Sequence, residues 1–324
     1  MDPVTHTLIG VGIANAFVRR RVGSPAVPIL AVASNLPDVD ALVHLWGDQS
    51  VILMRRTFGH SVFTIPIWAL ALALIFRRAY PALPLRTIWG LVSLGAIVHV
   101  FFDLVNSFGV VLLWPLSDWR PEFAVIFIVD IALTGLVAAP LLLGLVPVMR
   151  PHIETLSQVC LVAAALYVGA CWTGRAMAED ALSAWIARGE AHPEWVYVFP
   201  EPLGPLRWRG VFREQEAYRV FLVDVPSGRV APRGEVRTAA DDPRVRQVRE
   251  TLLGRRLDWF FKAPVWTVET SERLRAPAEH PPDVVSAYDL RFRSLVVERP
   301  VPFVFRFLVG EHGVVRRWDG EGRP

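Results

Sequence analysis

The sequence is poor in cysteine and, in its first half, poor in charge. The 324 residues include two cysteines, Cys160 and Cys171, and both lie in one apolar run. The second half therefore has no disulfide framework, and cysteine usage does not assign it to a compartment. The net charge of +3 is too small to indicate a nucleic-acid partner, because basic and acidic groups are interleaved throughout the second half. We therefore expect no nucleic-acid partner.

The shortage of charge is confined to residues 1–174. This part carries 10 of the 34 lysines and arginines and 9 of the 31 acidic residues, although the whole chain has a mean hydropathy of +0.37 and is 53% hydrophobic. Residues 175–324 hold the remaining charges at the density of water-exposed protein. This division predicts a membrane-embedded domain over 1–174 and a soluble domain over 175–324, each long enough for its own core.

Six apolar runs occupy the first half. They lie at about 4–18, 25–36, 61–76, 87–105, 123–148 and 153–173. A full membrane span needs roughly 20 residues, so the last three runs qualify, the third nearly does, and the first two could be tilted or re-entrant. The first run is not a secretory signal, because an acidic residue precedes it and three arginines follow it. The pattern predicts an α-helical membrane bundle of five or six segments.

The second half is expected to form a β-rich α+β domain outside the membrane. Short runs rich in valine and aromatic residues alternate there with proline, glycine and charged clusters. They lie at 195–200, 218–225, 265–270, 284–292 and 302–309. This pattern predicts an antiparallel sheet, with a hairpin turn at 226–229. Helices are expected at 242–253 and, as an amphipathic linker, at about 175–190.

Ionisable side chains interrupt or border the apolar runs. They are His6, Asp38, Asp40, His60, His99 and Asp103. A charge or an imidazole in hydrocarbon is costly, so such a residue is a functional candidate by default. Histidine nitrogen with aspartate oxygen is the ligand mixture that suits zinc, manganese or iron. Four residues separate His99 from Asp103, which places them on one helix face, and Pro37 favours a turn that carries Asp38 and Asp40.

Basic residues predict the orientation of these runs. If the six runs alternate in direction, the short loops of one side receive seven basic residues and those of the other side receive three. The positive-inside tendency makes the first side cytoplasmic, and the six ionisable side chains then converge near the outer face. We therefore expect a multi-pass protein in the lipid bilayer, with a metal site that faces the outer side.

Four motifs follow one another along the first half. They are MDPVTHTLIG at 1–10, NLPDVD at 35–40, RRTFGHS at 55–61 and HVFFDLVNSFGVVLLWP at 99–115. Together they resemble the YdjM-like family of bacterial inner-membrane proteins, described as predicted metal-dependent hydrolases and distantly similar to zinc-dependent phospholipase C and single-strand nucleases. The resemblance implies an inner (cytoplasmic) membrane location and metal ligation by the six ionisable residues above. Arg55 and Gly59 stand where many members have histidine and threonine, which leaves the number of ions open between one and three.

We therefore expect a membrane-bound metal-dependent hydrolase that acts on a phosphoester or a lipid-linked phosphate, with zinc as the expected ion and manganese as the alternative. Asp38 or Asp40 could act as general base. Arg55 and Arg56 could bind an anionic phosphate, or they could touch lipid headgroups instead. Two alternatives stay open: a non-enzymatic membrane protein with a structural or transport metal site, and polar residues that only join helices and bind no metal.

Two further polar residues have alternative roles. Asn106, one turn after Asp103, could orient that carboxylate or end the helix. Asp130 lies inside the fifth apolar run, where it could support the site or hold helices together.

Overall fold

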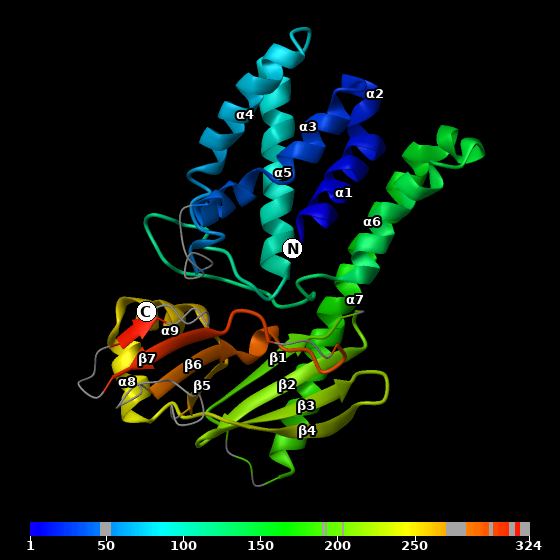
Figure 1. Cartoon of the computed structure of the whole chain (residues 1–324). Helices are drawn as coiled ribbons and strands as arrows, with labels where there is room; N and C mark the ends of the chain where they lie inside the picture. Colours follow the sequence, from blue (N-terminus) through cyan, green and yellow to red (C-terminus); the bar gives the residue numbers. More distant parts are fainter. Residues whose placement is uncertain are drawn as a thin grey trace. The chain divides into compact units, whose positions relative to one another are not determined.

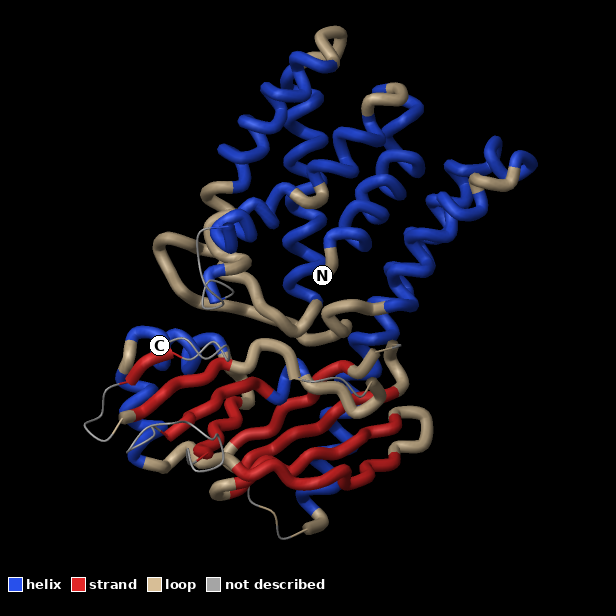
Figure 2. Tube along the Cα trace, viewed as in Figure 1, coloured by secondary structure: helices blue, strands red, loops and turns tan. Residues whose placement is uncertain are grey.

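The computed structural model describes residues 1–45, 53–189, 191, 193–202, 204–269, 283–297, 301–310 and 315–317. The chain divides into two compact units. Unit 1 is Met1–Met177 with Phe199–Trp208, and unit 2 is Ala178–Val198 with Arg209–Pro324. Unit 1 is mainly helical, and most of the strands belong to unit 2 (Figures 1 and 2).

Unit 1 is built from helices of very different lengths. They are α1 (Pro3–Ile13), the π-helical turn η1 (Ala14–Val18), α2 (Arg19–Val22), α3 (Ala26–Ala33), the 3-10 helix η2 (Leu36–Leu45), α4 (Ile65–Ala79), α5 (Leu85–Val105), α6 (Ile131–Leu143), the 3-10 helix η4 (Pro147–His152) and α7 (Ile153–Ala187). Helix α1 has a strong start signal, because Asp2 accepts a hydrogen bond from the Thr5 amide and Pro3 opens the helix.

The expectation of five or six membrane segments is wrong. Among the described residues, two helical stretches are long and apolar enough to cross a membrane: Leu85–Val105 and Pro147–Ala187. Helices α1, α3, α4 and α6 have 11, 8, 15 and 13 residues. At 1.5 Å per residue they are about 12–23 Å long, against about 30 Å for the hydrocarbon core of a bilayer. The orientation predicted from six alternating runs loses its basis with them.

The apolar runs are longer than the helices because they include turns and loops. The run at 61–76 starts in a turn, and its helix starts only at Ile65, next to Pro66. The run at 123–148 starts in a loop, and α6 follows Asp130. This aspartate accepts hydrogen bonds from the Leu133 amide at 2.9 Å and from the Tyr167 hydroxyl. Asp130 is therefore a helix cap that also holds α7.

Five of these helices pack against one another. Helix α5 packs against α3 and α4, and α1 packs against α3 and α6 (Figure 1). The core between α3, α4 and α5 consists of fully or nearly fully buried aliphatic side chains. A Cβ atom at Gly95 would lie 2.7 Å from the Ala33 Cβ atom and 3.0 Å from the Ser34 amide nitrogen. Glycine at this position thus lets the end of α3 approach α5 one turn before His99.

The strands form two four-stranded sheets, with the orders β1-β2-β3-β4 and β5-β6-β7-β8 (Figure 2). The strands are β1 (Trp195–Pro200), β2 (Arg207–Glu214), β3 (Ala217–Asp224), β4 (Arg229–Arg237), β5 (Pro264–Glu269), β6 (Asp283–Asp289), β7 (Phe305–Val309) and β8 (Val315–Arg317). The pairings of β3 with β4 and throughout the second sheet are antiparallel. Asp224 at the end of β3 pairs with Arg229 at the start of β4. This pairing confirms the hairpin turn that the sequence predicted at 226–229.

Each of the five predicted strand runs overlaps an observed strand, with residue 270 outside the described residues. The predicted helix at 242–253 is two helices, α8 (Pro243–Glu250) and α9 (Leu252–Phe260), because Thr251 between them is extended and caps α9. The linker helix expected at 175–190 is the end of α7. The domain boundary at 174 stays a prediction, and the two units separate within α7 after Met177.

Candidate metal centre

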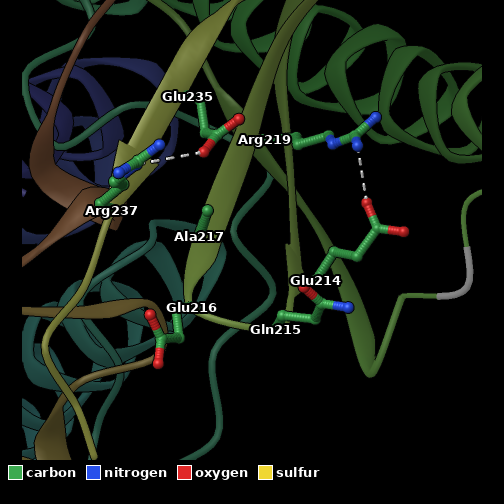
Figure 3. Close-up of a pocket in the computed structure, with 7 residues that line it drawn as sticks. All are labelled: Glu214, Gln215, Glu216, Ala217, Arg219, Glu235 and Arg237. Atoms are coloured by element: carbon green, nitrogen blue, oxygen red, sulfur yellow. Dashed lines mark ion pairs between the residues drawn. The ribbon is translucent and has the colours of Figure 1, made fainter.

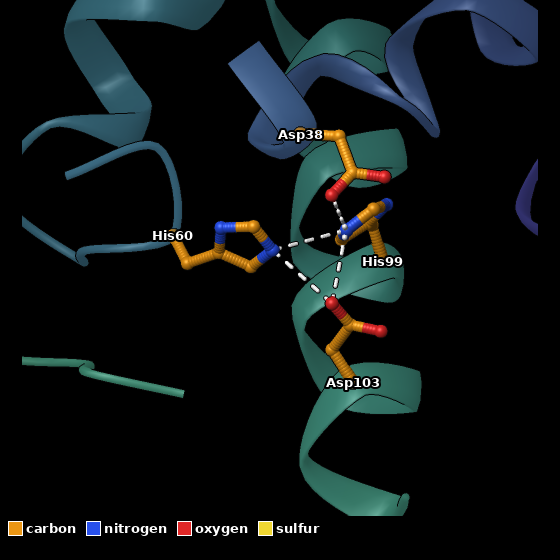
Figure 4. A group of neighbouring side chains, drawn as sticks. All are labelled: Asp38, His60, His99 and Asp103. Atoms are coloured by element: carbon orange, nitrogen blue, oxygen red, sulfur yellow. Dashed lines mark hydrogen bonds and ion pairs between the residues drawn. The ribbon is translucent and has the colours of Figure 1, made fainter. Parts of the chain in front are cut away.

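Three segments of unit 1 bring predicted ligands together (Figure 4). The 3-10 helix η2 carries Asp38, the turn before α4 carries His60, and the last two turns of α5 carry His99 and Asp103. One ligand atom from each of these four residues lies within 4.8 Å of all the others. The side chains of His60, His99 and Asp103 are buried, and that of Asp38 is 14% exposed.

The spacing of these atoms matches a metal coordination sphere. A tetrahedral site with bonds of about 2.1 Å separates neighbouring ligand atoms by about 3.4 Å. The Nε2 atoms of His60 and His99 are 3.2 Å apart, and they lie 3.1 and 3.3 Å from the Asp103 Oδ2 atom. The Asp38 Oδ1 atom is 4.0 Å from the His99 Nε2 atom. Three donors thus form one face of a tetrahedron, and Asp38 lies at a looser fourth corner.

Hydrogen bonds fix which histidine nitrogens carry protons. The His99 Nδ1 atom is 2.7 Å from the carbonyl oxygen of Ser34, which can only accept, so Nδ1 carries the proton. The His60 Nδ1 atom donates to the Asp40 Oδ2 atom at 2.9 Å. In the neutral rings, both Nε2 atoms therefore direct a lone pair toward the same space as the carboxylates. Metal-binding histidines are oriented in this way, by a carbonyl or a carboxylate on the other nitrogen.

The centre also has more acceptors than the described residues satisfy. The Oδ2 atom of Asp38 and the Oδ1 atom of Asp40 are buried and accept no hydrogen bond from the described residues. A buried carboxylate oxygen without a donor is costly, and a cation removes that cost. By its donor types, its spacing and its unpaired oxygens, this group could bind a metal ion.

The other two predicted ligands, Asp40 and His6, join the cluster from its edges. The Asp40 Oδ2 atom also accepts a hydrogen bond from the Thr57 amide at 3.0 Å, so this carboxylate holds His60 in place. His6, from α1, places its Nε2 atom 3.2 Å from the Asp103 Oδ1 atom and stacks its ring on that of His99 at 3.7 Å. Asp103 therefore faces His60 and His99 with one oxygen and His6 with the other.

The two arginines of the RRTFGHS motif have different environments. The Arg56 side chain is 6% exposed; its Nε atom is 2.8 Å from the Asp103 Oδ2 atom, and it donates to the Asn106 side chain at 2.8 Å. The Arg55 side chain is 31% exposed, and its Nη2 atom is 3.4 Å from the Asp38 Oδ1 atom. The buried Arg55 Nε atom has no acceptor among the described residues. Their predicted role in substrate binding stays a prediction, and the geometry favours Arg55 for it.

Backbone features that the sequence did not reveal complete the centre. A Cβ atom at Gly59 would lie 2.0 Å from the Pro37 carbonyl oxygen, so glycine allows the His60 turn to touch η2. Arg56 has φ of 59°, the left-handed region that is costly for a non-glycine residue. The Ser34 carbonyl and the Thr57 amide orient the two histidines, and backbone groups leave no signal in a sequence. Asn106, by contrast, does contact Asp103, as one of its two expected roles requires.

The environment sets the charge of the histidines outside the two candidate spans. Burial, with His99 as the next cause, lowers the pKa of His6 to about 3, so this ring is neutral near pH 7. Burial also disfavours the charged form of His60, but Asp40 and Asp103 outweigh it and raise the pKa of His60. The two carboxylates therefore favour a positive charge on the His60 ring.

A second, polar hollow lies in unit 2 at the turn between β2 and β3 (Figure 3). It has a volume of about 470 Å³ and is lined by Glu214, Gln215, Glu216, Ala217, Arg219, Glu235 and Arg237. Its ion pairs join Arg219 to Glu214 at 3.0 Å and Arg237 to Glu235 at 3.8 Å. The Arg237 side chain is 91% exposed, so water screens this pair. The hollow contains no predicted site residue.

The structure combines two helices that are long and apolar enough to cross a membrane with a buried aspartate–histidine group that could bind a metal ion. The chain belongs to the YdjM inner membrane protein family, whose model matches residues 1–178, the part that contains the whole centre. The expected family and the membrane location are thereby confirmed. The chain is similar to the uncharacterized protein YfhP of Bacillus subtilis (strain 168), with 30% identity over 124 residues that cover 36% of this chain and 38% of YfhP. No solved structure matches the chain.

Proposed function

We propose that the protein is a membrane-bound metal-dependent hydrolase that acts on a phosphoester or a lipid-linked phosphate. The observation that carries this proposal is the convergence of two histidine Nε2 atoms and two carboxylates beside the half-buried Arg55. A group that only joined helices would satisfy its own polar atoms, whereas here two carboxylate oxygens lack a donor among the described residues.

His60, His99, Asp103 and Asp38 would hold the ion, and His6 adds a nitrogen on the far oxygen of Asp103. Two nitrogen and two oxygen donors suit zinc first and manganese second. When bound, a divalent ion would lower the pKa of a water molecule and polarise a phosphoryl oxygen. The mixture of donors does not fix a number between one and three ions.

The remaining residues receive roles from their contacts. Asp38 is the better general base of the two aspartates, because its side chain is partly exposed whereas that of Asp40 is fully buried. Asp40 is fully buried and orients His60. Arg55 keeps a donor for a substrate oxygen, whereas Arg56 neutralises Asp103. These three carboxylates and two arginines sum to −1, which one divalent ion changes to +1, so the loaded centre attracts an anionic substrate.

Metal content tests the centre itself. We expect protein purified without chelator and offered zinc or manganese to hold at least one ion per chain, and His60→Ala to lose most of it. Asp40→Asn should weaken binding about 10- to 100-fold, because it removes an orienting carboxylate. His152→Ala, on an exposed histidine, is the matched control. Absence of metal from the wild-type protein, measured by elemental analysis, would refute the metal centre.

Turnover tests the reaction. A panel of phosphomonoesters, phosphodiesters and phospholipids should show hydrolysis that requires metal, stops on chelation and falls by orders of magnitude in Asp38→Asn. Arg55→Ala should raise KM for anionic substrates and leave the metal content unchanged. A metal-loaded protein without turnover on the whole panel would instead support the structural or transport site.

A further inference from the structure

Two loops of unit 1 expose large apolar side chains beside the metal centre. One loop precedes α4 and contains His60, and the other joins α5 to α6. The exposed residues, which we call the apolar rim, are Val62, Phe63, Leu113, Trp114, Leu116 and Trp119, with exposures of 37% to 77%. Such a concentration of exposed apolar side chains marks an interaction surface.

Hydrogen bonds tie the rim to the centre. The Val62 amide donates to the Leu112 carbonyl at 3.0 Å, and the Ser61 hydroxyl donates to the Trp114 carbonyl at 2.6 Å. The Val111 amide donates to the Arg56 carbonyl at 2.8 Å. The loop after α5 is therefore attached along the segment that carries Arg56 and His60, so the position of the rim relative to the centre is fixed within unit 1.

The depth of the rim identifies its partner. Helix α5 is one of the two candidate membrane spans and ends at Val105, directly before the second loop. His99 lies six residues before this end, or about 9 Å along the helix. If α5 crosses the membrane, the centre lies near the boundary between headgroups and acyl chains, where tryptophan side chains concentrate. At that depth the apolar neighbour of the rim would be lipid.

We infer that the apolar rim binds the acyl chains of a phospholipid whose phosphate reaches Arg55 and the metal centre. This inference rests on the proposed function and narrows its substrate class from phosphoesters in general to bilayer lipids that carry a phosphate group. Leu116 and Trp119, which are 77% and 59% exposed, would contribute most of the chain contact. The centre supplies the charge recognition, and the rim supplies the preference for long chains.

Equilibrium binding tests the rim without requiring turnover. Full-length, metal-loaded protein in phosphatidylcholine nanodiscs is titrated with dilauroyl and with dibutyryl phosphatidate, which share a headgroup and differ in chain length. We expect the double variant Leu116→Gln/Trp119→Gln to bind dilauroyl phosphatidate about tenfold or more weakly than the wild type, the effect of losing one buried apolar side chain. Its affinity for dibutyryl phosphatidate should stay the same. Leu252→Gln, on an exposed leucine of unit 2, is the matched control.

The outcomes separate the two proposals. If the double variant and the Leu252→Gln control bind dilauroyl phosphatidate with equal affinity, the rim does not bind acyl chains. Another protein or water then covers that surface. Equal loss of affinity for both lipids also overturns the inference, because the substitutions then act on the centre. Chain-length-dependent binding that the double variant abolishes, in a metal-loaded protein without turnover on the whole phosphoester panel, supports the rim and refutes the hydrolase. Metal content and thermal midpoint of each variant show that it is folded.

Discussion

Arg56 shows how much a single residue contributes to this centre. Its guanidinium contacts Asp103 and Asn106 and lies 4.7 Å from the centre of the Phe108 ring. A buried carboxylate needs such a partner, since removal of one member of a buried ion pair leaves an uncompensated charge. Asp103 is shared between this arginine and the histidines, so Arg56 also balances the charge of a residue that would bind metal.

We predict that Arg56→Gln lowers the free energy of unfolding of the metal-free protein by about 3 kcal/mol. Arg56→Lys should lose less, because lysine keeps the charge but cannot contact Asp103 and Asn106 with one planar group. Chemical denaturation in detergent measures the difference, with Arg78→Gln on an exposed arginine as control. A loss for Arg56→Gln no larger than that of the control would mean that the Asp103 contact contributes little to stability.

The residues of the centre were largely predictable, because each is an ionisable group in apolar surroundings. All six predicted ligands lie in one cluster, although their roles as ligands stay predictions. Asp130 shows the limit of that signal: an acid inside an apolar run also marks the start of a helix, as its bond to the Leu133 amide shows. The Ser34 carbonyl, which sets the proton of His99, could not be predicted, because every residue has a carbonyl.

At the scale of elements, the close contact between α3 and α5 positions His99. The neighbourhood of Gly95 has no room for a Cβ atom, whereas an added Cβ at Gly90, on the same helix, would have no atom within 4 Å. Substitution of each glycine by alanine therefore distinguishes two effects on α5: Gly95 tests its packing against α3, and Gly90 tests its intrinsic helix propensity. Alanine favours a helix over glycine by about 1 kcal/mol when nothing obstructs it.

We predict that Gly95→Ala lowers both the thermal midpoint and the metal affinity, because α5 must move away from Ser34 and His99 moves with it. Gly90→Ala should leave the metal affinity unchanged and preserve or raise the thermal midpoint. Thermal unfolding and metal titration of the two variants check this pair. Unchanged metal affinity in Gly95→Ala would show that the His99–Ser34 bond tolerates a shift of the helix.

In unit 2, the residues at the start of α8 predict that the stability of this helix depends on pH. Asp242 accepts hydrogen bonds from the Arg244 amide and side chain, and the side-chain bond, against the effect of burial, lowers the pKa of Asp242 below its ordinary value of 3.8. A lowered folded-state pKa stabilises the helix above about pH 3.8, and this stabilisation disappears as the pH falls through the folded-state pKa.

We predict that Asp242→Ala lowers the hydrogen-exchange protection of residues 243–250 about fivefold near neutral pH, which corresponds to about 1 kcal/mol for a lost cap. The partly exposed ion pair with Arg244 adds little to this. The loss should shrink toward pH 3. Thr251→Ala, which removes the uncharged cap of α9, is the control and should cost the same at each pH. A constant loss in Asp242→Ala would exclude the charge as its cause.

At the scale of the whole molecule, the division into a helical and a strand-rich part was predictable, but the number of membrane segments was not. Hydropathy alone does not distinguish a helix from the loop that continues it, as the run at 123–148 shows. Strands β2 and β4 escaped prediction because they are rich in arginine and glycine, and β4 also contains Pro232 opposite Phe221, at an irregularity in the pairing. A strand is recognised in a sequence when buried and exposed side chains alternate along it. Strands β2 and β4 do not show this regular alternation.

The ligand groups come from three segments that are far apart in the sequence, η2, the turn that carries His60, and α5. An unfolded chain does not hold them together, so an ion that binds the centre binds the folded state far better than the unfolded one. Its binding free energy then adds to the stability of unit 1, by about 2.7 kcal/mol at a free ion concentration of 100 times Kd. Under metal starvation the protein would lose this contribution to its stability, so the fraction of unfolded chains that proteases can degrade would rise.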